Sequence, residues 1–97
     1  MIFDDLKNKK IILTGGSRGI GLAILDKFYS LGAKVLIIGS NKKNLENIKK
    51  KYLGIFVEAF DLNNHSEIPS LFEKCVKQLG GLDVLINNAG ITKDNLA

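Results

Sequence analysis

The sequence predicts an α/β fold in which a parallel sheet is doubly wound, with helices on both of its faces. Short apolar runs alternate along the chain with longer runs whose apolar residues recur at helical spacing. The links between these runs are short, which favours strand–helix–strand units with right-handed crossovers. A glycine-rich turn also follows the first apolar run, at the position where such sheets commonly bind their ligands.

Four apolar runs are predicted as strands. They are apolar at successive positions, as expected for strands that are covered on both faces of a parallel sheet. The predicted strands are residues 9–14, 34–39, 55–60 and 83–87. The fourth should have a neighbour on its far side and finds none in this chain, so we expect its outer edge to be unpaired and the chain to be marginally stable.

Three helices are predicted between the strands, at residues 17–31, 42–52 and 66–79. A glycine follows each of them, as is common at helix ends. The third helix carries an apolar stripe at helical spacing, which belongs to the core and not to a cofactor site. The stripe is formed by Ile68, Leu71, Phe72, Cys75, Val76 and Leu79. We therefore interpret Cys75 as a buried apolar residue and not as a nucleophile or ligand.

The glycine-rich turn carries the strongest functional signal. It consists of Thr14, Gly15, Gly16, Ser17, Arg18, Gly19, Ile20 and Gly21. A tight turn after a strand needs a residue free to adopt positive φ, which Gly15 or Gly16 provides. Side chains at Gly19 and Gly21 would block the close approach of a pyrophosphate and of the helix to the sheet. Because the first N–H groups of the helix then face the ligand, the turn is predicted to cradle an anion.

The composition is that of one globular domain. The chain has 97 residues and a formal net charge of +4, and its single arginine, Arg18, lies in the glycine turn. The lysine groups fit the solvated face of a helix, and no basic face interleaved with aromatic residues indicates nucleic-acid binding. No apolar run approaches the length of a membrane span and no signal-type segment is present, so we expect a soluble, cytoplasmic protein without a membrane partner or a metal. Tyr29 and Tyr52 are interpreted as packing residues.

Two motifs resemble those of the short-chain dehydrogenase/reductase family. The first is Thr-Gly-x-x-x-Gly-Ile-Gly at residues 14–21, and the second is Asn-Asn-Ala-Gly at residues 87–90. The segment that follows, Gly-Ile-Thr-Lys-Asp-Asn-Leu, is similar to the 3-oxoacyl-[acyl-carrier-protein] reductase branch. The resemblance implies the amino-terminal part of a single Rossmann domain, incomplete over residues 1–97, with four strands in the order 3-2-1-4 and three helices.

The resemblance implies a nicotinamide cofactor, and the exit of the second strand favours NADP(H). Ser40, Asn41 and Lys42 follow that strand, and no carboxylate occurs before Glu46. A carboxylate about 4 Å from a 2′-phosphate would cost roughly 4 kcal/mol per unit charge at an effective dielectric constant of 20. Arg18, Lys42 and Ser40 can instead favour the phosphate. Ser40 and Asn41 could also serve as caps of the next helix.

Further cofactor contacts are implied at the exits of the third and fourth strands. Asp61 and Leu62 match the family's adenine contacts, although Asp61 alone could simply turn the chain. Asn88, Ala89 and Gly90 match the segment that lines the cofactor cleft. The two neighbouring amides at this strand exit, Asn87 and Asn88, could also hold adjacent turns together.

The residues that catalyse reduction in the family have no counterpart in this chain. The family uses a Ser, a Tyr with a Lys four residues later, and an Asn on a fourth helix, and neither tyrosine here has such a lysine. We therefore expect the NADP(H)-binding portion of an oxidoreductase of fatty acid synthesis that reduces a 3-oxoacyl-carrier-protein ketone. We expect it to be inactive alone and homotetrameric at full length. Two alternatives stay open: a family member that acts on another alcohol or ketone, and a non-catalytic nucleotide-binding module.

Overall fold

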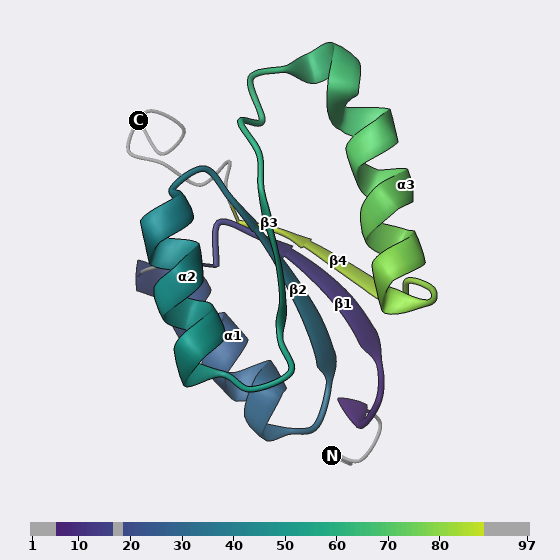
Figure 1. The fold of residues 1–97 in the computed structure, drawn as a ribbon. Helices are drawn as coiled ribbons and strands as arrows, with labels where there is room; N and C mark the ends of the chain where they lie inside the picture. The colour runs from purple at the N-terminus through teal and green to yellow at the C-terminus, as the bar shows by residue number, and fades with distance from the viewer. Residues whose placement is uncertain (1–5, 17–18, 89–97) are drawn as a thin grey trace, which may run out of the picture.

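The computed structural model describes residues 6–16 and 19–88, whose strands form one parallel sheet (Figure 1). The strands in these residues are β1 (Lys10–Thr14), β2 (Lys34–Gly39), β3 (Phe56–Ala59) and β4 (Val84–Asn87). They lie in the order β3-β2-β1-β4, and each neighbouring pair is parallel. The predicted order 3-2-1-4 is therefore confirmed, and the carboxyl ends of the four strands meet at one edge of the sheet.

Helices cover both faces of this sheet, as a doubly wound fold requires. On one face lie α1 (Gly19–Ser30) and α2 (Lys42–Lys51), and on the other lies α3 (Ile68–Leu79) (Figure 1). A short 3-10 helix, η2 (His65–Glu67), precedes α3. The predicted helix start at residue 66 was therefore two residues early for the α-helix, and Pro69 lies in its first turn, where the missing N–H costs little.

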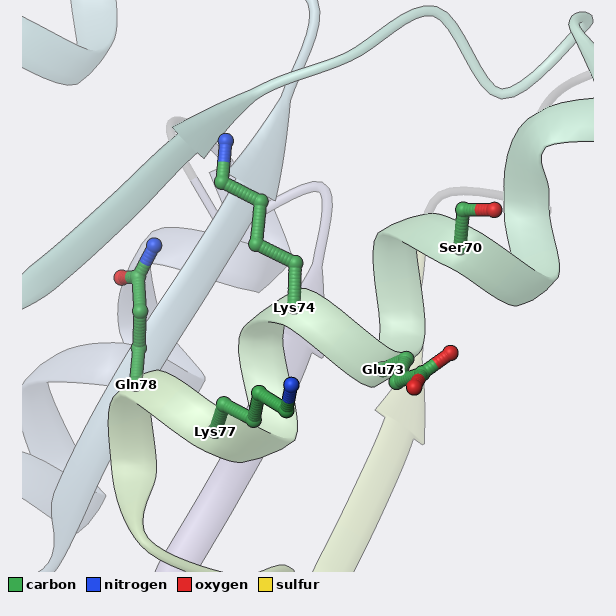
Figure 2. A pocket seen from close by; sticks show the side chains of 5 residues that line it. All are labelled: Ser70, Glu73, Lys74, Lys77 and Gln78. Atoms are coloured by element: carbon green, nitrogen blue, oxygen red, sulfur yellow. The ribbon is translucent and has the colours of Figure 1, made fainter.

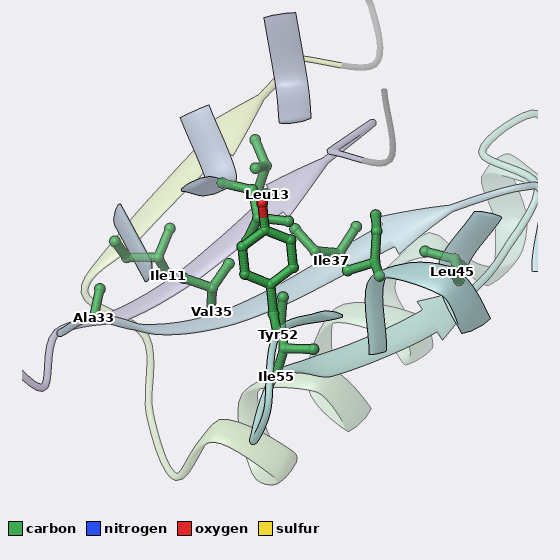
Figure 3. Packing of buried hydrophobic residues seen from close by; sticks show 10 residues of the cluster. Ile11, Leu13, Ala33, Val35, Ile37, Leu45, Tyr52 and Ile55 are labelled. Atoms are coloured by element: carbon green, nitrogen blue, oxygen red, sulfur yellow. The ribbon is translucent and has the colours of Figure 1, made fainter. Parts of the chain in front are cut away.

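The two faces of the central strands form separate cores, because successive strand side chains point to opposite faces. Ile11 and Leu13 belong to the core under α1 and α2, whereas Ile12 belongs to the core under α3. Figure 3 shows the first of these cores, in which Leu45 from α2 and Tyr52 at the end of α2 pack with residues of β1 and β2. Burial of each such side chain contributes roughly 1.5–3 kcal/mol.

The apolar stripe predicted on the third helix packs into the second core. Leu71, Cys75 and Leu79 are buried there, with Phe72 and Val76 partly buried beside them. Burial, together with the charge of Glu58, raises the pKa of the Cys75 thiol from 9.0 to about 11. The interpretation of Cys75 as a buried apolar residue is therefore confirmed. A protonated, enclosed thiol is a poor nucleophile and a poor metal ligand.

Among the described residues, the sheet ends at β3 on one side and at β4 on the other. Val84 and Leu85 on β4 are 36% and 49% exposed, and Leu82 just before them is 41% exposed. β4 pairs only with β1 among the described residues, so its outer edge is unpaired there, as predicted. None of the helices in the described residues is long and apolar enough to cross a lipid bilayer.

Candidate functional site

The candidate site lies at the carboxyl edge of the sheet, where β1 and β4 end side by side. Thr14 and Asn87 are paired in the strand register, and the Thr14 hydroxyl donates a hydrogen bond to Asn87 Oδ1 at 2.9 Å. Thr14 is buried, with 3% of its surface exposed. This bond joins the last residues of both strands and so fixes the position from which the glycine turn starts.

Gly15 begins the turn and is held from both sides. Its N–H donates to the carbonyl oxygen of Ile38 at 2.8 Å, and its own carbonyl oxygen accepts from Asn88 Nδ2 at 3.0 Å. Its φ of 72° lies in the left-handed region, which a residue with a side chain rarely adopts. The prediction that a glycine supplies positive φ here is confirmed for Gly15, whereas Gly16 does not adopt it.

Two further glycines of the turn are needed because of close packing. A Cβ atom on Gly21 would collide with the carbonyl oxygen of Gly15 and would lie 2.6 Å from Asn88 Nδ2. A Cβ atom on Gly16 would lie 2.7 Å from Ile37 Cδ1 and 2.8 Å from a methyl group of Leu13. The expectation that a side chain at Gly21 would block the approach of α1 to the sheet is therefore confirmed.

Gly19 differs from these glycines because space lies open beside it. Its φ is 61°, and no described atom lies within 4 Å of the position that a Cβ would occupy. The next residue, Ile20, is 68% exposed at the start of α1. The open space beside Gly19, at the N-terminus of α1, leaves room for a ligand whose negative charge faces the helix. The exposed apolar side chain of Ile20 lies next to this space.

The exit of β2 presents polar and basic side chains to the same edge. Ser40, Asn41 and Lys42 are exposed. Asn41 is the N-cap of α2, and its side-chain oxygen accepts from the N–H of Asn44 at 3.0 Å. The capping alternative is therefore confirmed for Asn41, since that oxygen is already engaged. No acidic residue lies in the first turn of α2, which instead holds Lys42 and Lys43.

The exit of β3 is a tight turn built by Asp61. Its carboxylate accepts from the N–H of Asn63 at 2.9 Å, and its carbonyl oxygen accepts from the N–H of Asn64 at 3.0 Å. Leu62 packs partly buried against the core under α3. The chain-turning alternative for Asp61 is thus confirmed, and the adenine contact of Asp61 and Leu62 stays a prediction.

Ser17, Arg18, Ala89 and Gly90, which were also predicted to bind cofactor, lie outside the described residues. The described part of the site adds one residue that the predicted set lacked, Asn87, whose side chain accepts from Thr14. Its signal in the sequence was its place as the first residue of the Asn-Asn-Ala-Gly motif. The expectation that two neighbouring amides hold adjacent turns together is confirmed by the bonds of Asn87 and Asn88.

A separate hollow lies on α3, on the other face of the sheet (Figure 2). It has a volume of about 560 Å³ and is lined by Ser70, Glu73, Lys74, Lys77 and Gln78. These side chains are exposed, and Lys74 is already paired with Glu58 at 2.9 Å. The hollow contains none of the predicted cofactor residues. Within the described ranges, no three side chains of His, Cys, Asp or Glu gather to hold a metal ion.

Comparison with known proteins gives a family-level match. Residues 9–97 match the family model described as short chain dehydrogenase. The chain is 38% identical over 95 residues to the 3-oxoacyl-[acyl-carrier-protein] reductase FabG of Chlamydia pneumoniae, with 94% of this chain and 38% of that protein covered. It is also 35% identical over 98 residues to a 3alpha-hydroxysteroid dehydrogenase of Mediterraneibacter gnavus, with 95% of this chain and 39% of that protein covered.

A solved structure agrees with these relatives. The 3-ketoacyl-(acyl-carrier-protein) reductase of Brucella melitensis, described as complexed with NADH, superposes with a TM-score of 0.75 at 25% identity, over 82% of this chain and 33% of that one. The chain therefore spans less than two-fifths of the length of each of these proteins.

Proposed function

The chain belongs to the short-chain dehydrogenase family, and from this premise we propose that it is the NADP(H)-binding portion of a 3-oxoacyl-carrier-protein reductase. The whole enzyme would reduce the 3-oxoacyl ketone to the 3-hydroxyacyl form during fatty acid synthesis. One observation carries the cofactor part of the proposal: Gly15, which begins the glycine turn, is fixed at the carboxyl edge of the sheet, and space lies open at Gly19.

The glycine turn would hold the diphosphate of the cofactor. Gly15, at the start of the turn, is held by hydrogen bonds to β2 and to Asn88 that need no ligand. α1 begins at Gly19, and the free N–H groups of its first turn carry about half a positive elementary charge. The exposed Ile20 would pack against the cofactor, which would cover its apolar side chain.

The 2′-phosphate of NADP(H) would lie at the exit of β2, beside Ser40 and Lys42. Two lysines at the positive end of a helix each oppose the helix dipole by about 0.3–1 kcal/mol, and α2 has no carboxylate in its first turn to offset them. A bound phosphate dianion would remove that repulsion. Asn41 would contribute through its backbone, since its side chain caps α2, and Arg18 is proposed as a further cation.

The rest of the cofactor would follow the edge of the sheet. Asp61 and Leu62 would flank the adenine, and Asn88, Ala89 and Gly90 would line the side nearest the nicotinamide ribose. When bound, the cofactor supplies the hydride for ketone reduction. The residues of this chain bind and orient it, whereas the proton donor and its partners would lie in the larger part of the enzyme that the relatives possess.

The substrate part of the proposal has its support in the segment after Asn88 and in the FabG relative. The hydroxysteroid dehydrogenase relative supports the alternative that a different alcohol or ketone is the substrate. We propose a cytoplasmic location and a homotetramer for the whole enzyme, and we expect no reductase turnover from the 97-residue polypeptide. The codons that follow Ala97 test this part: a Ser and a Tyr-x-x-x-Lys segment support the reductase, and a stop codon favours a non-catalytic nucleotide-binding module.

A matched pair of glycine substitutions tests the cofactor part. Gly19 and Gly54 both have positive φ, at 61° and 82°, and neither has a described atom within 4 Å of a Cβ position. Gly19→Ala and Gly54→Ala should therefore cost similar stability, about 1 kcal/mol each. Only Gly19→Ala would place a methyl group against the diphosphate.

The expected result, from fluorescence titration with NADPH, is an affinity at least tenfold weaker for Gly19→Ala and nearly unchanged for Gly54→Ala. Equal affinities for NADPH in the two variants, with both folded by circular dichroism, would remove the cofactor assignment.

A further inference from the structure

Two tyrosines join α1 to α2 at the ends of these helices that lie away from the glycine turn. The Tyr52 hydroxyl, from the end of α2, donates to Asp26 Oδ1 on α1 at 3.0 Å. The Tyr29 hydroxyl, from α1, donates to the carbonyl oxygen of Leu53 just after α2, at 2.6 Å. The two rings meet edge to face, with centroids 5.0 Å apart and planes at 75°. The ends of α1 and α2 are therefore joined by two hydrogen bonds, each donated by a tyrosine.

Tyr52 belongs to the core, and Tyr29 packs against that core partly buried. Tyr52 is 4% exposed and lies in the same cluster as Ile37 and Ile55 (Figure 3). Burial, the hydrogen bond to Asp26 and the charge of Asp26 all raise the pKa of Tyr52 above its ordinary value of 10.0. The hydroxyl therefore stays protonated as a donor throughout the neutral range.

The opposite ends of the same helices flank the proposed cofactor site. α1 begins at Gly19, beside the glycine turn, and α2 begins at Lys42, two residues after Ser40. At this end α2 follows the short link from β2 and packs on the sheet through Leu45, which is 3% exposed. α2 has ten residues and is about 15 Å long, so a tilt about the buried Leu45 that begins at its tyrosine end also moves its Lys42 end.

We propose that Tyr52 and Tyr29 are positioning residues that set the spacing between the diphosphate turn on α1 and the 2′-phosphate position on α2, and so set the preference for NADPH over NADH. The inference rests on the proposed function. The tyrosines do not touch the cofactor, and they act through the placement of Ser40 and Lys42 relative to Gly19.

The expected loss of NADPH affinity is moderate, and NADH affinity should not share it. If the Lys42 end shifts by about 1 Å, a charge contact at about 4 Å loses roughly a fifth of its energy at an effective dielectric constant of 20. That loss corresponds to about a three- to fivefold change in affinity. NADH lacks the 2′-phosphate, so its affinity should change little.

The experiment measures dissociation constants for NADPH and NADH in the wild-type chain and in Tyr52→Phe, Tyr29→Phe, Asp26→Ala and Asp26→Asn. The Phe variants keep the rings and remove one hydrogen bond each. We expect Tyr52→Phe, Tyr29→Phe and Asp26→Ala to lower the ratio of NADPH affinity to NADH affinity three- to fivefold. Asp26→Asn keeps an acceptor oxygen for Tyr52 and should retain the wild-type ratio.

Lys74→Met is the control, since it breaks the ion pair with Glu58 on the other face of the sheet and should leave the ratio unchanged. A lower melting temperature with an unchanged ratio in Tyr52→Phe and Tyr29→Phe would overturn the inference and leave the proposed function intact. A wild-type chain that does not prefer NADPH would overturn the proposed function and this inference together.

Discussion

The side-chain amide of Asn88 donates a hydrogen bond to the carbonyl oxygen of Gly15 at 3.0 Å, across 73 positions of the chain. The bond ties the exit of β4 to the glycine turn after β1. Gly21 on α1 approaches both partners so closely that a Cβ atom there would collide with the Gly15 oxygen. The exit of β4, the glycine turn and the start of α1 therefore meet at one point of contact.

The replacement Gly21→Ala should disrupt this contact point and should cost more stability than Gly16→Ala. The Cβ at Gly21 would meet backbone, which cannot move without displacing the turn, whereas the Cβ at Gly16 would meet the ends of the Ile37 and Leu13 side chains. Overpacking of this kind costs about 1–3 kcal/mol, and we expect Gly21→Ala near the upper end and Gly16→Ala near the lower. Urea denaturation measures both, and the reverse order of stabilities would contradict the packing described here.

Much of the fold could be predicted because its signals are local. The apolar strands, the amphipathic helices and the glycines that end them are each encoded within a few neighbouring residues. The strand order followed from the alternation of these elements together with the resemblance of two short motifs. The start of α3 was misplaced, since residues 65–67 form a 3-10 helix, whose composition differs little from that of an α-helix start.

Less of the candidate site could be predicted, because its contacts depend on register. The bond from Thr14 to Asn87 exists only because β1 and β4 pair with these two residues opposite one another. Two side chains assigned to the cofactor turned out to serve the chain itself: Asn41 caps α2 and Asp61 turns the chain after β3. Polar residues at strand exits favour both roles equally, so composition alone could not separate them.

A carboxylate at the exit of β2 should reverse the cofactor preference. In Ser40→Asp, the new charge would repel a 2′-phosphate and would offer an acceptor to the ribose hydroxyls of NAD(H). The repulsion approaches about 4 kcal/mol at 4 Å and an effective dielectric constant of 20, and exposure of Ser40 to solvent reduces it. We expect NADPH affinity to fall at least tenfold and NADH affinity to be retained or to rise. Ser40→Asn is the neutral control, and an equal loss for both cofactors in Ser40→Asp would argue against a phosphate at this position.

Stability should fall at alkaline pH because of the Cys75 thiol. Its pKa is raised from 9.0 to about 11 in the folded chain, chiefly by burial, so folding favours the neutral thiol. This contribution is complete below pH 9 and is lost as the pH rises towards 11, at about 1.4 kcal/mol per pH unit. Urea denaturation at pH 8, 10 and 11 under reducing conditions should show this slope.

Cys75→Ala is the control for this measurement, since it keeps Tyr52 and Lys74, whose pKa values are also raised. The difference between the two proteins therefore isolates the thiol. Parallel pH profiles for the wild-type chain and Cys75→Ala would show that the thiol is not enclosed as described.

The 97-residue polypeptide should self-associate through β4. Leu85 is 49% exposed on an edge strand whose residues, Val84 to Asn87, carry no charge, and an unpaired apolar edge is a template for another strand. The other edge strand, β3, carries Glu58, which is held by Lys74. Leu85→Lys should therefore shift the polypeptide towards monomer in sedimentation velocity at increasing concentration. Leu53→Lys makes the same chemical change at a leucine that is 79% exposed in a turn away from the edge. If Leu53→Lys reduces association as much as Leu85→Lys, general surface hydrophobicity is responsible and not the edge of β4.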